Sequence, residues 1–113
     1  MLKIYGISNC DTVKKTTKWL ENNNVDFDFH DFRKDGCDKA LVSSFFEKID
    51  WTTLVNKRST TYRNLDADVK DNLSESVAFD LILEQPTLIK RPVIIAEDKA
   101  IVGFSEKELN TLL

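Results

Sequence analysis

The sequence contains few glycines and prolines, no long apolar run and no excess of basic charge. Only 3 Gly and 2 Pro occur among 113 residues, of which 42% are hydrophobic, so collagen-like and disordered compositions are excluded. The 16 basic residues are outnumbered by 19 acidic ones, and the net charge of −3 disfavours nucleic acid as a partner. No apolar segment approaches the roughly 18 to 20 residues of a membrane span. The first five residues lead into a Gly/Ser/Asn loop rather than an apolar signal segment, so we expect a cytoplasmic protein without a membrane partner.

Cysteine and histidine are also scarce. The chain has two cysteines, Cys10 and Cys37, and one histidine, His30. These are too few for a disulfide scaffold or a four-ligand zinc site, so we expect no metal. In a reducing compartment both thiols stay free and are either inert or catalytic. The length fits one compact domain.

The first third of the chain predicts a βαβ unit. Residues 2–5 predict a short strand, and residues 12–22 predict a helix with Val13, Thr17 and Leu20 on one face. Residues 25–30 alternate apolar and polar side chains, which predicts a second strand. Parallel strands joined by a right-handed crossover bring the loop after the first strand and the end of the second to one sheet edge. Cys10 and His30 are predicted to lie along that edge.

The rest of the chain predicts a helical segment and then a hairpin. Apolar spacing indicates helices over 38–49 and 74–84, the second capped by Ser74, with loops and short helical turns over 51–73. Strands follow over 93–96 and 100–102, joined by a turn over 97–99. Ser105 and Glu108 form a capping box that opens a terminal helix carrying Leu109, Leu112 and Leu113. This order predicts an α/β fold with a small mixed sheet and helices packed around it.

Cys10 is the first candidate for chemistry. It follows a strand and begins a helix, where unpaired N–H groups and the helix dipole favour a thiolate. Lys14 and Lys15 add positive charge and Asp11 opposes them, so we expect a lowered thiol pKa. The alternative is a small, partly buried structural cysteine. His30 is either a proton-transfer group on the same edge or a solvated residue on the polar face of its strand.

The residues around Cys10 do not form a C-x-x-C pair, because Val13 stands where a second cysteine would be. Cys37 can resolve a disulfide at Cys10 only if the two Cα atoms come within about 7 Å. Otherwise it is an incidental surface cysteine. Arg58, Arg63 and Arg91 are candidates for binding an anion, and the Arg91–Pro92 peptide bond is compatible with a trans or a cis geometry.

Four segments in order resemble one known family. They are Tyr5-Gly6-Ile7-Ser8-Asn9-Cys10-Asp11-Thr12-Val13-Lys14-Lys15, Asp31-Phe32-Arg33-Lys34-Asp35-Gly36, Asn56-Lys57-Arg58-Ser59-Thr60-Thr61-Tyr62-Arg63 and Ile89-Lys90-Arg91-Pro92-Val93. With the terminal Gly-Phe-Ser-Glu segment, they resemble the ArsC/Spx family, and most of all its YffB-like branch, over essentially the whole chain. The resemblance implies a single domain over 1–113 with a thioredoxin-like fold. Its mixed four-stranded sheet carries a helical insertion over approximately 33–85, between the second and third strands.

The resemblance also implies site residues. Cys10 matches the family's nucleophilic cysteine, and Lys14 stands where arsenate reductases have an arginine. Arg58 and Arg91 match two arginines that bind the oxyanion or thiol substrate, and Pro92 matches the normally cis proline of the thioredoxin fold.

Two segments depart from the arsenate reductase pattern. Gly103-Phe104-Ser105-Glu106 lacks the third arginine, and Ile7-Ser8-Asn9 replaces the His-Asn-Pro segment before the cysteine. These departures count against arsenate as the natural substrate.

We therefore predict a thiol oxidoreductase that uses glutathione as co-substrate and holds no tightly bound cofactor. Cys10 forms a mixed disulfide or covalent adduct that an external thiol resolves, while Asn9, Lys14, Arg58, Arg91 and Pro92 bind the substrate. The expected partners are small thiols or disulfides, with a protein disulfide as a further option, and the protein is expected to be a monomer. The alternative is a non-catalytic regulator of the Spx type that binds RNA polymerase, although Val13 removes the second cysteine of the C-x-x-C redox switch.

Overall fold

The computed structural model describes residues 2–97 and 99–113, and their contacts divide the chain into two compact units. We call residues 2–36 with 91–113 the sheet unit, and residues 37–90 the helical unit. The helical unit falls where the insertion was predicted, but it begins and ends a few residues later. That the whole chain forms one domain stays a prediction, and each unit is described by itself.

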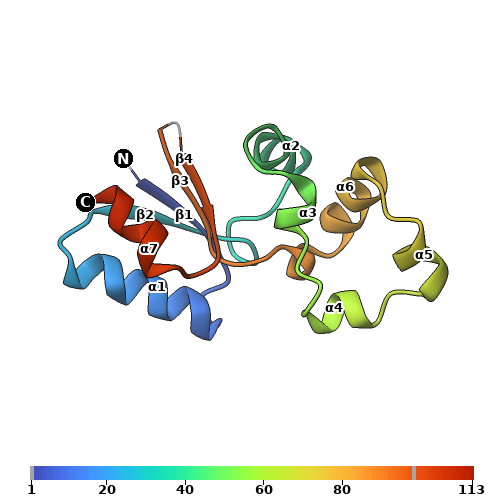
Figure 1. Ribbon diagram of the computed structural model, residues 1–113, viewed down its shortest axis with the longest axis horizontal. Coiled ribbons are helices and arrows are strands. Elements are labelled where there is room, and N and C mark those ends of the chain that lie inside the picture. Colours follow the sequence, from blue (N-terminus) through green and yellow to red (C-terminus); the bar gives the residue numbers. More distant parts are fainter. Residues whose placement is uncertain (1, 98) are drawn as a thin grey trace. The chain divides into compact units, whose positions relative to one another are not determined.

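The sheet unit contains a mixed four-stranded sheet, as predicted (Figure 1). Its strands are β1 (Leu2–Gly6), β2 (Phe27–Asp31), β3 (Val93–Ala96) and β4 (Lys99–Val102), in the order β2-β1-β3-β4. The first two run parallel, joined through α1 (Asp11–Asn22), and the β1–β3 and β3–β4 pairs are antiparallel. The parallel pair confirms the βαβ unit. One residue of the predicted hairpin turn, Asp98, lies outside the described residues.

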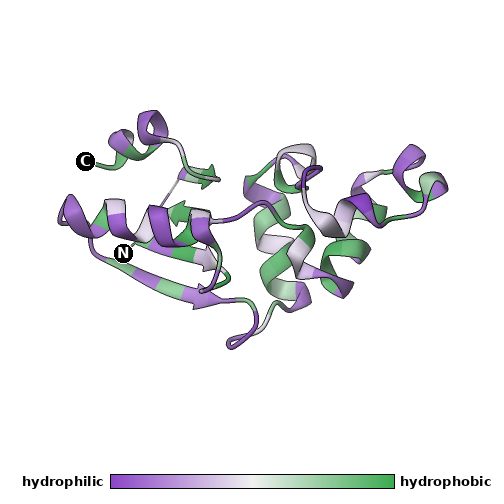
Figure 2. Ribbon diagram, turned by 90° about the horizontal axis from the view of Figure 1, so that it is seen from below, coloured by the Kyte–Doolittle hydropathy of each residue, from purple (hydrophilic) through white to green (hydrophobic). Residues whose placement is uncertain are grey.

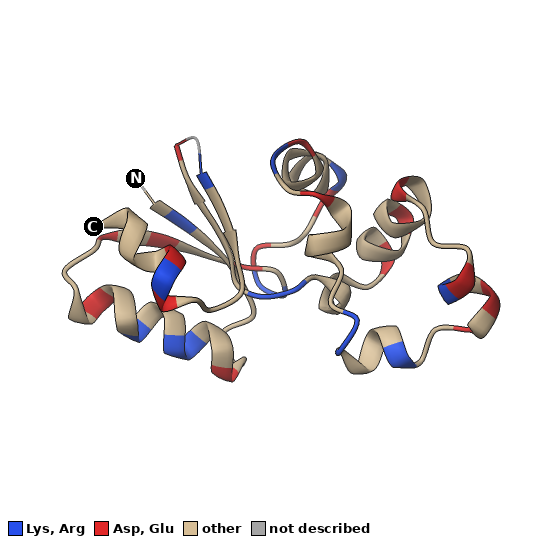
Figure 3. Ribbon diagram, in the orientation of Figure 1, with Lys and Arg blue, Asp and Glu red and all other residues tan. Residues whose placement is uncertain are grey.

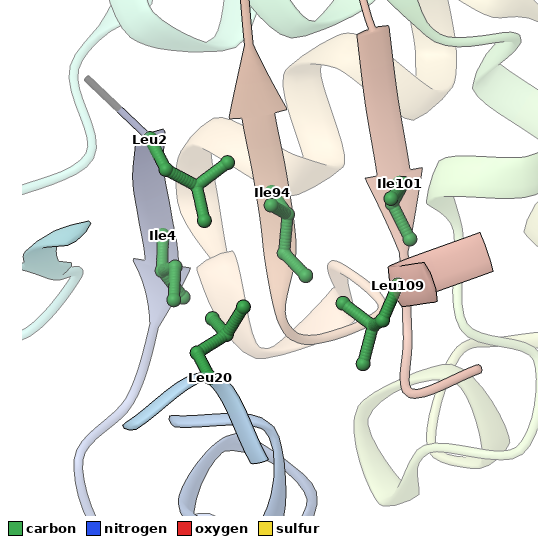
Figure 4. Packing of buried hydrophobic residues seen from close by; sticks show 6 residues of the cluster. All are labelled: Leu2, Ile4, Leu20, Ile94, Ile101 and Leu109. Carbon is green, nitrogen blue, oxygen red and sulfur yellow. The ribbon is translucent and has the colours of Figure 1, made fainter. Parts of the chain in front are cut away.

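The core of the sheet unit lies between one sheet face and two helices. Side chains from three strands meet Leu20 of α1 and Leu109 of α7 (Glu106–Leu109), as Figure 4 shows. The six buried members are Leu2, Ile4, Leu20, Ile94, Ile101 and Leu109. Burying a side chain of this size contributes about 1.5 to 3 kcal/mol, so this cluster fixes α1 and α7 on the same face of the sheet.

The second strand differs from its prediction in where it starts and ends. β2 covers Phe27–Asp31 rather than residues 25–30, and its most buried residue is Asp31 instead of a phenylalanine. Because side chains alternate along a strand, Asp31 lies on the same sheet face as Phe27 and Phe29, the face that α1 covers. His30 lies on the opposite face.

Helix α1 starts at Asp11, ends at Asn22 and buries one face. The buried residues are Val13, Thr16 and Leu20. The predicted buried face was therefore wrong at one position, since it contained Thr17 instead of Thr16. The Thr16 hydroxyl stays satisfied in the core because it donates to the carbonyl of Thr12, 2.8 Å away. After the helix, Asn24 adopts a positive φ of 58°, a conformation that commonly ends helices.

The helical unit consists of short helices, four of which have a side-chain cap. They are α2 (Lys39–Lys48), α3 (Trp51–Leu54), α4 (Thr60–Arg63), α5 (Ala67–Asp71), α6 (Glu75–Glu84) and the 3-10 turn η1 (Pro86–Leu88). Asp38, Asp50, Ser59 and Ser74 each accept a backbone N–H at a helix start. Figure 2 shows hydrophobic residues along α2 and α6, whose buried members include Val42, Phe45, Ala78 and Ile82. The predicted helices and the irregular stretch between them are thus confirmed.

The C-terminal segment confirms the predicted cap but not the full apolar face. Ser105 accepts the N–H of Glu108 at 3.3 Å, and α7 continues into the 3-10 turn η2 (Asn110–Leu112). Leu109 is buried, whereas Leu113 is 66% exposed and does not belong to the core. No helix within residues 2–97 and 99–113 has the length and apolar character needed to cross a membrane.

Candidate functional site

Cys10 lies at the junction between a turn and α1. Its N–H donates to the carbonyl of Ile7 at 3.1 Å, which closes a four-residue turn, and its own carbonyl accepts the N–H of Lys14 at 3.0 Å, which begins the helix. The side chain is half-buried. The sulfur is thus placed by the backbone at the positive end of a twelve-residue helix.

The surroundings of Cys10 favour its thiolate. Partial burial by itself would raise the pKa of the thiol. Hydrogen bonds from the Val13 N–H, from the Arg91 side chain and from the Thr12 N–H outweigh it, and with the charge of Arg91 they leave the pKa of Cys10 lowered. The expectation of an acidic thiol is confirmed in direction, and Arg91 rather than a nearby lysine supplies the cation.

Arg91 and Pro92 enter the sheet unit together, just before β3. The Arg91–Pro92 peptide bond is cis, and the Pro92 carbonyl accepts the N–H of Gly103 at 2.8 Å. In the segment that follows Gly103, the Phe104 ring lies 4.5 Å from the Lys15 ammonium, measured to the ring centroid. Gly103 stands where the arsenate reductase pattern has its third arginine, and the residue that follows it is an aromatic ring covered by a lysine.

Asn9 and Lys14 flank Cys10 along the chain. Asn9 is exposed within the four-residue turn, and Lys14 is exposed on the first turn of α1. Lys14 also lines a small hollow of about 170 Å³ together with Ser8, Val13, Thr17 and Phe29. The groups that lower the pKa of Cys10 are Val13, Arg91 and Thr12. A role for Asn9 and Lys14 in substrate binding stays a prediction.

Arg58 belongs to the helical unit, in the turn that leads into α4. Its side chain is exposed, and its N–H donates to the Asn56 side chain at 3.0 Å. It lines a pocket of about 490 Å³ that also contains Lys57 and Lys90. Figure 3 shows basic residues in this segment and along α1. The pocket's three cations suit an anionic ligand.

His30 interacts with the loop after β2 and with two neighbouring aromatic rings. Its Nε2 donates to the carbonyl of Gly36 at 2.7 Å, because a carbonyl can only accept. The ring also contacts the aromatic rings of Tyr5 and Phe32, with centroids 5.2 and 6.1 Å away. The histidine thus stabilises the loop after β2, and a proton-transfer role for it stays a hypothesis.

Cys37 has the opposite chemical character to Cys10. It is half-buried rather than a surface residue, and neither cysteine, both within the described residues, takes part in a disulfide. Burial and the neighbouring Asp38 charge raise the pKa of Cys37 to about 11. Its thiol is therefore protonated at neutral pH and a poor nucleophile.

Sequence analysis missed Asp31, which is 4% exposed at the end of β2. Its carboxylate accepts the N–H groups of Ser8, Arg33 and Lys34 at 3.3, 2.8 and 3.4 Å. Burial opposes ionisation, but the bonds from Arg33, Ser8 and Lys34 hold the pKa of Asp31 below its ordinary value. The alternation of β2 was the available signal, since it places Asp31 on the phenylalanine face. Among the described residues, no cluster of three or more His, Cys, Asp or Glu could hold a metal ion.

Comparison with known proteins assigns the chain to a family. The model of the ArsC family matches residues 5–112. The chain belongs to the ArsC family. The predicted α/β fold with a mixed four-stranded sheet is confirmed.

Individual ArsC-family relatives match over nearly their whole length. A protein of Haemophilus influenzae is 50% identical over 108 residues, which cover 96% of this chain and 95% of that protein. The solved structure of the YffB protein is 37% identical, covers 98% of this chain and 97% of its own, and superposes with a TM-score of 0.91. The global transcriptional regulator Spx of Lactiplantibacillus plantarum is 26% identical and covers 100% of this chain and 86% of its own.

Proposed function

We propose that this protein is a thiol–disulfide oxidoreductase in which Cys10 is the nucleophile and glutathione the co-substrate. The observation that carries the proposal is the lowered pKa of Cys10, to which the Arg91 side chain and the N–H groups at the start of α1 contribute. Membership of the ArsC family supports it. A thiolate stabilised at a helix N-terminus beside an arginine is the usual form of a reactive cysteine.

The reaction takes two steps. The Cys10 thiolate attacks one sulfur of a substrate disulfide, forms a mixed disulfide and releases the other sulfur as a thiolate. A glutathione thiolate then attacks the sulfur that the substrate has left on Cys10. The product disulfide departs and the Cys10 thiolate is regenerated. The resolving thiol comes from outside, because Cys37 is protonated at neutral pH.

Five residues bind the substrate in this proposal. Arg91 stabilises the thiolate of Cys10 and the thiolate that leaves, Asn9 supplies a hydrogen-bond donor next to Cys10, and Pro92 lines the substrate site next to Arg91. Lys14 and the Arg58 pocket attract the carboxylates of glutathione, and the Lys57 and Lys90 side chains that share this pocket fit that role.

The test is a glutathione-coupled disulfide reduction assay, run with hydroxyethyl disulfide and, separately, with arsenate. We expect activity on the disulfide in the wild type and in Cys37→Ser, none in Cys10→Ser, and a single glutathione adduct on Cys10 by mass spectrometry. A wild type that forms no adduct with glutathione disulfide and reduces neither substrate contradicts the proposal.

A second candidate is a non-catalytic regulator of the Spx type that binds RNA polymerase. The similarity to proteins named global transcriptional regulator Spx favours it. It predicts a stable complex with RNA polymerase that Cys10→Ala leaves intact. The enzyme proposal predicts that the same substitution abolishes activity, so the two are separable in one pair of variants.

A further inference from the structure

The Asp31 carboxylate joins two backbone segments of the sheet unit. One oxygen, Oδ2, accepts the Ser8 N–H, and the other, Oδ1, accepts the N–H groups of Arg33 and Lys34. Asp31 is 4% exposed, and a buried carboxylate stays ionised only when such donors satisfy it. The same three partners hold its pKa below the ordinary value.

The position of Asp31 brings it to the turn before Cys10. Asp31 pairs with Gly6 across the parallel strands, and the Phe32 N–H donates to the Gly6 carbonyl at 2.8 Å. Ser8 follows two residues after Gly6, inside the turn that the Cys10 N–H closes on Ile7. The turn is thus fixed from within by one hydrogen bond and from outside by Asp31.

We propose that Asp31 is a positioning residue for Cys10: it holds the turn Ile7–Cys10 so that the sulfur meets the Val13 N–H and Arg91. Asp31 acts through Ser8, whose N–H and side chain both hydrogen-bond the carboxylate. The inference deepens the proposed function, since it concerns the same sulfur. It rests on that function only for the biological use of the thiolate, because Cys10 reactivity can be measured without any substrate.

The sign of the effect separates positioning from a direct charge effect. A carboxylate near a thiolate disfavours the thiolate, so removing the charge alone would make Cys10 more reactive. Loss of positioning has the opposite effect, because the sulfur then loses hydrogen bonds that stabilise its ionised form. Asp31→Asn therefore slows Cys10 alkylation if Asp31 positions the turn, and speeds it if only the charge matters.

Two substitutions break the same hydrogen bond from opposite ends. In Asp31→Asn, the remaining carbonyl oxygen still accepts the N–H groups of Arg33 and Lys34. The amide NH2 group then faces the Ser8 N–H, and the hydrogen bond to Ser8 is lost because an NH2 group donates and does not accept. Ser8→Pro removes the N–H itself, at a turn position where proline is well tolerated. Ser8→Ala is its reference, because it loses the Ser8 hydroxyl as Ser8→Pro does but keeps the N–H. Asp28→Asn on the exposed side of β2 is the matched control for charge.

The experiment measures iodoacetamide alkylation of Cys10 against pH in a Cys37→Ser background, with thermal melting of every variant. We expect Asp31→Asn and Ser8→Pro each to slow alkylation at pH 7 by about threefold or more, because the thiolate fraction sets the rate. The double variant is expected to be no slower than the slower single variant, since both remove one interaction. Asp28→Asn keeps the wild-type profile.

Three results overturn the inference: a wild-type profile in Ser8→Pro, faster alkylation in Asp31→Asn, or additive losses in the double variant. If Asp31→Asn does not fold, Ser8→Pro against Ser8→Ala decides alone. If the wild type forms no glutathione adduct while these profiles still shift, the proposed function fails and the role of Asp31 stands.

Discussion

Val13 packs directly against the Cα of Gly6, where a Cβ on the glycine would lie 2.8 Å from Val13 Cγ2. Real Cβ atoms essentially never approach another atom so closely. The contact brings the end of β1 against the first turn of α1, which directly follows Cys10. Val13 is also the position of the second cysteine in a C-x-x-C motif, and its side chain is only 2% exposed. This position holds a packing residue instead of a redox partner.

Gly6→Ala is therefore expected to destabilise the protein by about 1 to 3 kcal/mol, the usual range for an overpacked core. Val13 is β-branched and buried, so it has little freedom to move aside. Urea denaturation measures the change in the free energy of unfolding. The double variant Gly6→Ala with Val13→Ala is expected to lose less free energy of unfolding than the sum of the losses in the two single variants. Full additivity would show that the contact is not the cause.

Arg91→Gln is expected to raise the pKa of Cys10, because it removes both a cationic charge and a charge-assisted hydrogen bond to the sulfur. Arg91→Lys keeps the charge but loses the planar guanidinium, so the pKa of Cys10 in this variant is expected to lie between those in the wild type and in Arg91→Gln. The alkylation rate against pH reports the change. Arg63→Gln, on exposed α4 of the helical unit, is the control that should leave the profile in place. An unchanged profile in Arg91→Gln would remove Arg91 from the site.

Brief alkylation of the wild type at pH 7.5 is expected to modify Cys10 and spare Cys37. The pKa of Cys10 is lowered, whereas that of Cys37 is raised to about 11, and only the thiolate reacts. Peptide mapping by mass spectrometry locates the adducts. About 6 M urea unfolds most small domains. Under that condition both cysteines should react at similar rates. Preferential labelling of Cys37 in the folded protein would contradict both pKa directions.

Cys37 is also expected to make stability depend on alkaline pH. Its pKa is raised on folding from an ordinary 9.0 to about 11. The folded state thus favours the protonated thiol, and this contribution is present below pH 9.0 and is lost as the pH rises through about 11. Cys37→Ala should lose less stability than the wild type across that window, measured by thermal melting at each pH. Parallel curves for the two proteins would show that the thiol does not titrate as described.

Local patterns in the sequence were sufficient for much of the fold. The parallel pair of strands, the caps at Ser74 and Ser105, and the position of Cys10 at the start of a helix all follow from residues close together in the chain. Apolar periodicity and capping act over one or two turns, so they are visible without a structure. Buried faces were less certain, as Thr16 in place of Thr17 shows.

The surroundings of the sulfur were decided only by the tertiary structure. The sequence by itself determined that a thiol stands at a helix N-terminus, between a strand and an amphipathic helix. The fold selected Arg91, from the distant end of the chain, as its cation. It also placed His30 on the sheet face opposite Asp31, within a hydrogen bond of the Gly36 carbonyl, and buried Asp31 against Ser8 of the turn. The physical reason is that sheet register determines which side chains distant in sequence share a face, and each strand alternates its faces at every residue.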